Sequence, residues 1–294
     1  MDKNTIYNNV DLKSFNSWKV GGRAEQFLIC DDKAILSSLI KTKKIKLPIT
    51  FLGLGSNLLV RDGGVKGTVI VLHGGLKKIN HDEDNLIYSE AGVSCSKLAK
   101  FTAGKGLGNS AFFSGIPGTV GGALAMNAGC YGSETWDYVQ KVLMINLDGD
   151  QVERNKLDFK INYREVKNSN TDEFFLAAWF KFPKGDKEEA GKKIRELLAH
   201  RKNTQPLNCP TAGSTFRNPQ GNFAAKLIED CDLKGYRIGG AQVSEKHANF
   251  IINLGDASAQ DIENIIIYIQ QVVFKKKNIQ LKREIKIIGE NIGI

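Results

Sequence analysis

Residues 109–132, NSAFFSGIPGTVGGALAMNAGCYG, have a composition that suits contact with a phosphate-bearing ligand. The stretch contains six glycines and no charged side chain, in a chain where 25% of the residues are charged. Glycine loses the most conformational entropy on folding, so a dense cluster indicates that the backbone approaches something closely, with N–H groups available to a pyrophosphate. The hydroxyls of Ser114 and Thr119 could donate as well. Composition alone supports a run of tight turns in a β-rich domain equally well.

A second glycine-rich turn, GLGSNL, covers residues 53–58 and carries a further hydroxyl on Ser56. It follows a short apolar run that is typical of a buried strand. The turn does not complete the pattern GxGxxG, and no long amphipathic helix follows it directly. A Rossmann-type dinucleotide site is therefore not supported.

Three further residues could do chemistry, and each also has a simpler explanation. Ser214 in GSTFRNP has neither a neighbouring base nor a GxSxG motif, which favours a loop or capping serine. Glu284 lies in a terminal segment that puts Ile285 and Ile287 on one face, which favours a solvated strand face for the glutamate. Arg164 in NYRE, taken by itself, indicates only a surface salt-bridge partner.

The elements that must position these residues follow from hydrophobic periodicity. It predicts helices over residues 31–44, 94–106, 185–203 and 258–276, and a short helix that starts at residue 223 and ends near Gly235. Asp32 can cap the first of these, and Ser258 with Asp261 forms a capping box at the last. Strands are predicted within residues 47–60, 67–74, 85–92, 139–182, 247–253 and 278–289, with a hairpin turn at Asp148 and Gly149. The charged helix at 185–203 marks a domain break.

Length, charge and cysteine content limit the class of protein. A chain of 294 residues can bury a large core and favours more than one domain. Neither a signal peptide nor an apolar run long enough for a membrane span is evident. The five cysteines are widely spaced without a CxxC motif, so we expect no disulfide framework, no metal site and a reducing cytoplasm. The net charge of +9 comes from dispersed lysines, which suits small anionic ligands as well as it suits nucleic acid.

Seven blocks along the chain resemble one known family. SGIPGTVGGALAMNAGCYG resembles the flavin-cradling segment of the UDP-N-acetylenolpyruvoylglucosamine reductase family. The other blocks resemble the same family in the expected order and span nearly the whole chain: NSWKVGGRAEQF (16–27), FLGLGSNLLVRDGG (51–64), NYR (162–164), AGSTFRNP (212–219), AAKLIEDCDLKGYRIGGAQVSEKHANFIIN (224–253) and REIKIIGE (283–290).

The resemblance implies an α+β fold with a non-covalently bound FAD. Residues 1–190 would form an FAD-binding region of two subdomains, of the vanillyl-alcohol-oxidase or PCMH type. Residues 191–294 would form an α+β substrate-binding domain, with the last strand carrying Glu284. The cofactor residues that this implies are Gly53, Leu54, Gly55, Ser56, Asn57, Leu58, Ser114, Gly115, Ile116, Pro117, Gly118, Thr119, Gly121, Gly122 and Ala123.

The resemblance also implies a reaction in peptidoglycan precursor synthesis. NADPH would reduce FAD, and flavin N5 would then give hydride to C3 of UDP-N-acetylglucosamine enolpyruvate, yielding UDP-N-acetylmuramate. Arg164 and Glu284 would stabilise the enol or enolate, and Ser214 would protonate C2. The substrate contacts implied are Tyr163, Arg217, Asn218, Arg237 and Gln242.

The chain departs from the usual family pattern at Val166, where a serine normally follows the Tyr-Arg pair. This removes whatever hydrogen bond that serine would make. The chain is also similar to the shorter form of the family, without an inserted tyrosine-bearing loop over the substrate, and we expect a monomer without a protein, nucleic-acid or membrane partner.

Two other classes of protein stay open at this stage. Another FAD-dependent oxidoreductase on the same cofactor fold would keep both glycine-rich turns, but would not need GSTFRNP together with a C-terminal glutamate. A basic nucleic-acid-binding protein would explain the net charge of +9, but not two uncharged glycine-rich loops.

Overall fold

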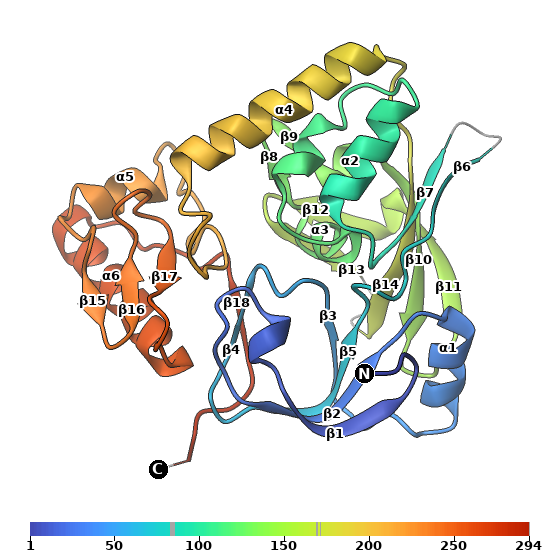
Figure 1. The fold of residues 1–294 in the computed structure, drawn as a ribbon, viewed down its shortest axis with the longest axis horizontal. Coiled ribbons are helices and arrows are strands. Elements are labelled where there is room, and N and C mark those ends of the chain that lie inside the picture. The colour runs from blue at the N-terminus through green and yellow to red at the C-terminus, as the bar shows by residue number, and fades with distance from the viewer. Residues whose placement is uncertain (83–85, 169, 171, 294) are drawn as a thin grey trace. The chain divides into compact units, whose positions relative to one another are not determined.

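A computed structural model gives the fold and describes residues 1–82, 86–168, 170 and 172–293 (Figure 1). The chain forms two compact units, each built from several segments. The first unit contains Met1–Asn8, Gln26–Leu54 and Gly67–Arg201. The second contains Asn9–Glu25, Gly55–Lys66 and the chain from Lys202 onwards. These units differ from the contiguous division at residues 190 and 191 that we expected, because two N-terminal segments group with the C-terminal part.

A four-stranded sheet has the order β1–β2–β5–β3, formed by β1 (Ile6–Asp11), β2 (Arg23–Ile29), β5 (Val65–Val71) and β3 (Ile49–Leu52). β3 runs parallel to β5, with Ile49 opposite Thr68. Helix α1 (Lys33–Lys41) confirms the helix predicted here, and the Asp32 carboxylate caps it by accepting from the N–H groups of Ala34 and Ile35. Leu36 and Ile40 of α1 are buried, so its apolar stripe contributes to the core of the first unit.

A five-stranded sheet forms the larger part of the first unit. Its strands lie in the order β11–β10–β14–β7–β6 (Figure 1). They are β11 (Gln151–Asn155), β10 (Val139–Asn146), β14 (Glu173–Phe180), β7 (Ile87–Glu90) and β6 (Ile79–His81), and every neighbouring pair is antiparallel. The hairpin predicted at Asp148 and Gly149 is confirmed, and Gly149 adopts the positive φ of 81° that such a turn demands.

Two helices and the core of the first unit accompany this sheet. Helix α2 (Cys95–Gly104) begins after Ser94, whose hydroxyl accepts from the N–H of Lys97, and confirms the predicted helix. Helix α3 (Val120–Met126) lies in the glycine-rich stretch, where the sequence predicted no helix. Short elements surround these helices: η2 (Ala111–Gly115), β8 (Gly129–Cys130), β9 (Ser133–Glu134) and η3 (Thr135–Asp137). Phe113, Trp136 and Phe180 are fully buried in this core.

A two-stranded hairpin and a long charged helix complete the elements around the first unit. Strands β12 (Phe159–Asn162) and β13 (Glu165–Asn168) pair antiparallel, with Asn162 opposite Glu165, after the short helix η4 (Lys156–Asp158). Their two-residue turn holds Tyr163 and Arg164. Helix α4 (Lys187–Thr204) confirms the charged helix predicted over residues 185–203.

The second unit is built around helix α6 (Ala259–Lys277), whose predicted capping box of Ser258 and Asp261 is present. It also contains η1 (Lys13–Phe15), α5 (Ala224–Glu229), a three-stranded sheet of β15 (Arg237–Ile238), β16 (Ala241–Val243) and β17 (Ile251–Asn253), and the parallel pair β4 (Leu58–Val60) and β18 (Lys286–Ile288). Trp18 is fully buried in this core and its indole N–H donates to the Ile251 carbonyl at 2.7 Å. Two contacts in this unit therefore join early and late parts of the chain: the hydrogen bond from Trp18 to Ile251, and the pairing of β4 with β18.

The structure corrects two predicted element boundaries in the second unit. The short helix α5 ends at Glu229, several residues before the end predicted near Gly235. The final strand β18 covers only Lys286–Ile288, so Glu284 lies before it rather than on it. The segment before β18 is held instead by a bridge between Arg283 and Phe216. In the described part of the chain, we find no helix with the length and apolar character needed to span a membrane.

Candidate active site

A cavity of about 450 Å³ opens in the first unit beside the glycine-rich helix α3. The cavity is lined by β3 with Gly53, by α3 and the residue before it, by parts of β13 and β14, and by Leu72 and Ala91. Its walls are mostly apolar, with Phe51, Phe174 and Phe175 among them. A concave apolar pocket with a few polar groups is the usual form of a cofactor site.

The start of α3 uses its backbone N–H groups within the protein. Val120 donates its N–H to the carbonyl of Val93 at 2.8 Å, and Gly121 donates to the carbonyl of Ala91 at 2.9 Å. The Thr119 hydroxyl oxygen caps the helix by accepting from the N–H of Gly122. These N–H groups are therefore not available to a pyrophosphate, contrary to our expectation for this part of the stretch.

Two of the glycines around the cavity allow close packing, and a third leaves open space. A Cβ at Gly53 would lie 2.4 Å from Thr119 Oγ1, and a Cβ at Gly121 would lie 2.9 Å from the Ala91 Cβ. A Cβ at Gly122 would have Thr119 Oγ1, at 3.8 Å, as its nearest neighbour. Since Gly122 lines the cavity, its missing side chain leaves room there for a ligand.

Most of the remaining candidate cofactor residues of the first unit lie just before α3. The Ser114 hydroxyl donates to the carbonyl of Ala111 at 2.6 Å, so its proton is engaged within the η2 turn. A Cβ at Gly115 would lie 2.9 Å from Cys130 Sγ, which shows a close approach of two segments. Ile116 packs against the core. Pro117 and Gly118 lie in the loop leading to α3, and Ala123 is a buried residue of α3. Leu54 directly follows the cavity-lining Gly53.

Arg164 is held firmly at the tip of the β12–β13 hairpin. It is a non-glycine residue with a positive φ of 55°. Its guanidinium donates to the carbonyl of Asn127 at 3.2 Å and to the carbonyl of Gly129 at 2.6 Å, and its Cζ lies 5.0 Å from the centre of the Tyr163 ring. The cation thus lies at the C-terminal end of α3, where the helix dipole favours positive charge.

Asn127 links this hairpin to α3. It ends the helix in the left-handed conformation, with φ of 46°. Its amide nitrogen donates to Glu134 Oε2 at 2.6 Å and to the carbonyl of Asn162 at 3.3 Å, while its amide oxygen accepts from the N–H of Trp136. Sequence reasoning missed this residue, although asparagine after a helical run is a recognised signal for a left-handed helix end.

Val166 and Glu173 show what the hairpin and β14 present to the cavity. Val166, which stands where the family usually has serine, contributes an apolar surface. The Glu173 carboxylate, whose side chain is 5% exposed, accepts from Arg154 at 2.5 Å and from Asn168 at 2.7 Å. The hydrogen bond from Arg154 is the main reason that the pKa of Glu173 is lowered, so this carboxylate stays charged. No local sequence pattern identifies Glu173.

In the second unit the structure brings Ser214 and Glu284 to adjacent segments. The N–H of Glu284 donates to the carbonyl of Thr215 at 2.8 Å, and the N–H of Arg217 donates to the carbonyl of Lys282 at 2.9 Å. Ser214 itself forms a bridge with Phe250. Two predicted catalytic residues that are far apart in sequence therefore lie on two segments joined by backbone hydrogen bonds.

The second glycine-rich turn is hydrogen-bonded to the segment that contains Glu284. The Asn57 amide donates to the Glu284 carbonyl at 3.2 Å, and the Asn57 carbonyl accepts from the N–H of Lys286 at 3.0 Å. Leu58 then pairs with Lys286 in the parallel ladder of β4 and β18. Gly55 has a φ of +63°, and a Cβ there would lie 2.3 Å from the Phe15 carbonyl, so this position needs glycine. Ser56 lies between Gly55 and Asn57 in the same turn.

Two buried polar atoms beside Ser214 have no hydrogen-bond partner among the described residues. They are Thr215 Oγ1 and Arg217 Nε. A buried donor without a partner costs about 1–3 kcal/mol, so such atoms often mark a place where a ligand completes the bonding. Arg217 is thus suited to bind an anionic or carbonyl group.

The other predicted substrate residues are more exposed and are engaged with backbone. Arg237 Nε donates to the Gly239 carbonyl at 2.7 Å, and the Gln242 amide donates to the Gly235 carbonyl at 3.1 Å. Arg237 and Gln242 face each other across β15 and β16. Asn218 accepts from the N–H of Ala224 at 3.0 Å, which closes the loop before α5.

Comparison with known families gives two matches along the chain. Residues 24–155 match the model of an FAD binding domain, and residues 205–288 match the model described as UDP-N-acetylenolpyruvoylglucosamine reductase, C-terminal domain. The first match includes β3, α3 and most of the cavity lining. The second includes Ser214, Arg217 and Glu284.

Individual relatives agree with these matches over almost the full length. UDP-N-acetylenolpyruvoylglucosamine reductase of Nitrosospira multiformis is 47% identical, over 95% of this chain and 87% of that protein. The reductase of Coxiella burnetii is 46% identical, over 95% of this chain and 94% of its own length. The crystal structure of UDP-N-acetylenolpyruvylglucosamine reductase (MurB) from Thermus caldophilus covers 95% of this chain with a TM-score of 0.82 and 30% identity. The predicted α+β fold, with an FAD-binding region followed by a domain of this type, is confirmed.

Proposed function

The chain belongs to the UDP-N-acetylenolpyruvoylglucosamine reductase family, and from this membership we propose that it reduces UDP-N-acetylglucosamine enolpyruvate to UDP-N-acetylmuramate, with NADPH as the reductant. The observation that carries the proposal is the identity of 47% over 95% of the chain, which includes both the FAD-binding and the C-terminal parts. The product is a precursor of peptidoglycan, and we expect the enzyme to act in the cytoplasm as a monomer.

The cavity beside α3 suits part of an FAD molecule. Its apolar walls can cover an aromatic ring system, and the open space at Gly122 admits ligand atoms where any other residue would place a side chain. When bound, FAD supplies the hydride chemistry, accepting from NADPH and giving to the substrate. We propose that Gly53, Thr119, Gly121 and Gly122 hold it here. Hydrogen-bond donors to the pyrophosphate would come from the loop before α3, since the first N–H groups of α3 are used by the protein.

Arg164 is proposed to stabilise negative charge on the substrate. Delivery of hydride to C3 of the enolpyruvyl group leaves an enolate on the carboxylate side. A guanidinium held in place before the reaction stabilises that charge without having to reorganise. The bonds from Arg164 to the carbonyls of Asn127 and Gly129 provide this fixed position.

Ser214 and Glu284 are proposed to complete the reaction at C2. Ser214 would donate the proton that C2 needs, as a general acid. Glu284 would orient the enol through a hydrogen bond that strengthens as charge develops. The support is their placement on adjacent segments, fixed by the bond from the Glu284 N–H to the Thr215 carbonyl. Arg217, with its unpartnered Nε, would contact the substrate beside them.

An anaerobic half-reaction experiment tests this function. The purified protein is reduced with NADPH while the visible flavin band is followed, and UDP-N-acetylglucosamine enolpyruvate is then added. We expect the band to bleach with NADPH and to return with the substrate. A flavin that is reduced but stays bleached would refute the substrate and favour a different FAD oxidoreductase. A protein that neither contains nor reconstitutes flavin would refute the cofactor site.

A further inference from the structure

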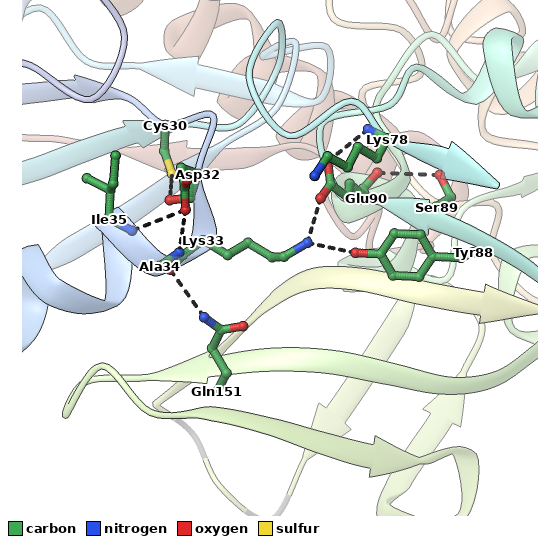
Figure 2. A network of polar contacts seen from close by, with 10 residues as sticks. All are labelled: Cys30, Asp32, Lys33, Ala34, Ile35, Lys78, Tyr88, Ser89, Glu90 and Gln151. Atoms are coloured by element: carbon green, nitrogen blue, oxygen red, sulfur yellow. Dashed lines mark hydrogen bonds and ion pairs between the residues drawn. The ribbon is translucent and has the colours of Figure 1, made fainter.

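An ion pair between the partly exposed Lys33 and the buried Glu90 links α1 to the five-stranded sheet of the first unit. Lys33, the first residue of α1, extends to β7 and contacts two side chains there (Figure 2). Its Nζ lies 2.5 Å from Glu90 Oε1 and donates to the Tyr88 hydroxyl at 2.7 Å. Glu90 is only 3% exposed. Burial works against the charge of Lys33, but the bonds to Glu90 and Tyr88 outweigh it and its pKa is raised.

The second oxygen of Glu90 is used by the backbone. Oε2 accepts from the N–H of Lys78 at 2.8 Å, and the Glu90 N–H donates to the Lys78 carbonyl at 2.9 Å (Figure 2). The carboxylate is therefore bonded on both oxygens, and the Lys33 ammonium is the charge that balances it. Removal of one partner of a buried pair leaves an uncompensated charge, which is strongly unfavourable.

Ala91, the residue after Glu90, is hydrogen-bonded to the start of the glycine-rich helix α3. The Ala91 N–H donates to the Leu176 carbonyl at 2.8 Å, and the Ala91 carbonyl accepts from the N–H of Gly121 at 2.9 Å. A Cβ added to Gly92 would lie 2.0 Å from the Leu72 carbonyl, so this segment packs closely against the backbone at Leu72. Ala91, Leu72 and Gly121 all line the cavity. A displacement of Glu90 would thus reach the cavity wall through one peptide bond.

We propose that Lys33 is a positioning residue for the FAD cofactor, which acts by neutralising Glu90 and so fixing Ala91, the backbone site on which α3 is seated. Lys33 does not line the cavity and lies far in sequence from both glycine-rich turns. The proposal rests on FAD binding at this cavity and not on the identity of the substrate.

The test measures FAD affinity in variants of the full-length holoenzyme, by flavin fluorescence during dialysis and reconstitution. We expect Lys33→Met to weaken FAD binding about tenfold or more, while turnover at saturating FAD stays within about threefold. The double variant Lys33→Met/Glu90→Gln removes both charges, and we expect it to recover most of the lost affinity. The matched control is Lys41→Met on the same helix, because Lys41 pairs with Asp150 at 2.7 Å where both side chains are more than half exposed. This control should bind FAD like the unaltered chain.

The proposal is overturned if folded Lys33→Met retains full FAD affinity, or if the double variant is as weak as the single one. If Lys33→Met does not fold, Lys33→Gln decides. This variant removes the balancing charge but keeps a hydrogen-bond donor for Glu90, and an FAD affinity equal to that of the unaltered chain would then refute the role of the pair. The affinity measurements use FAD alone, so their outcome is independent of the outcome with the nucleotide-sugar substrate.

Discussion

Gly122 offers a test in which stability and cofactor affinity change in opposite directions. The residue lies in the first turn of α3 and lines the cavity, and a Cβ built there has Thr119 Oγ1, 3.8 Å away, as its nearest atom outside the helix backbone. Gly122→Ala therefore creates no clash within the protein. Alanine in a helix is favoured over glycine by about 0.5–1 kcal/mol, so thermal unfolding of the FAD-free protein should shift upward by a few degrees at most. The added methyl group takes space that FAD occupies, and we expect FAD affinity to fall about tenfold.

Gly104→Ala is the matched control for this substitution. Gly104 is the last residue of helix α2, is exposed, and has no other atom within 4 Å of a built Cβ. It should show the same sign of stability change with no effect on FAD. Calorimetry on the FAD-free protein and fluorescence titration with FAD give the two quantities separately. If Gly122→Ala binds FAD as tightly as Gly104→Ala does, the cavity beside α3 is not the cofactor site and the reasoning fails.

Three other predictions address the reacting groups and the stability of the second unit. Ser214→Ala should still be reduced by NADPH, while its turnover falls by about a hundredfold or more, as measured by stopped-flow and steady-state assays; unchanged turnover would exclude Ser214 as the acid. Asn127→Gly keeps the positive φ but loses the hydrogen bonds that the Asn127 side-chain amide donates to Asn162 and Glu134, so we expect turnover to fall several-fold with FAD affinity intact. The hydrogen bond from Arg61 lowers the pKa of Glu263 in the folded protein. At pH values above the unfolded pKa of about 4.3, the pair therefore contributes about 1 kcal/mol to the free energy of unfolding, and this contribution is lost as the pH falls through the folded pKa. The free energy of unfolding, measured with urea at several pH values between 5 and 3, should therefore fall less with decreasing pH for Glu263→Gln than for the unaltered chain.

Elements with strong local signals could be predicted from the sequence. The Asp32 cap of α1, the capping box of α6 and the hairpin at Asp148 and Gly149 all depend on residues close together in the chain. In each case one side chain or one glycine satisfies a local geometric need, which explains why the sequence was enough. The resemblance of the glycine-rich stretch to a flavin-binding segment likewise depends on local composition.

Features that depend on distant partners could not be predicted in this way. The parallel pairing of β4 with β18 joins residues at opposite ends of the chain, and it decides where Glu284 stands. Alternation predicted a long terminal strand, but the bridge from Arg283 to Phe216 and the buried side chain of Leu281 determine its first part. The Lys33–Glu90 pair also joins two elements whose contact no local pattern reveals.

The glycine-rich stretch shows why composition left its role open. Its residues favoured either tight turns or free N–H groups for a phosphate, yet part of it folds into α3. There the first N–H groups of the helix bond to the carbonyls of Val93 and Ala91. Glycine is needed at Gly121 because a Cβ would meet the Ala91 Cβ at 2.9 Å, and at Gly122 because a side chain would enter the cavity. The same residue type thus serves two needs on consecutive positions: contact with the protein on one side and space for the ligand on the other. Substitutions at these two glycines should therefore differ, since Gly121→Ala must displace Ala91 and destabilise the fold, whereas Gly122→Ala should weaken FAD binding without destabilising the fold.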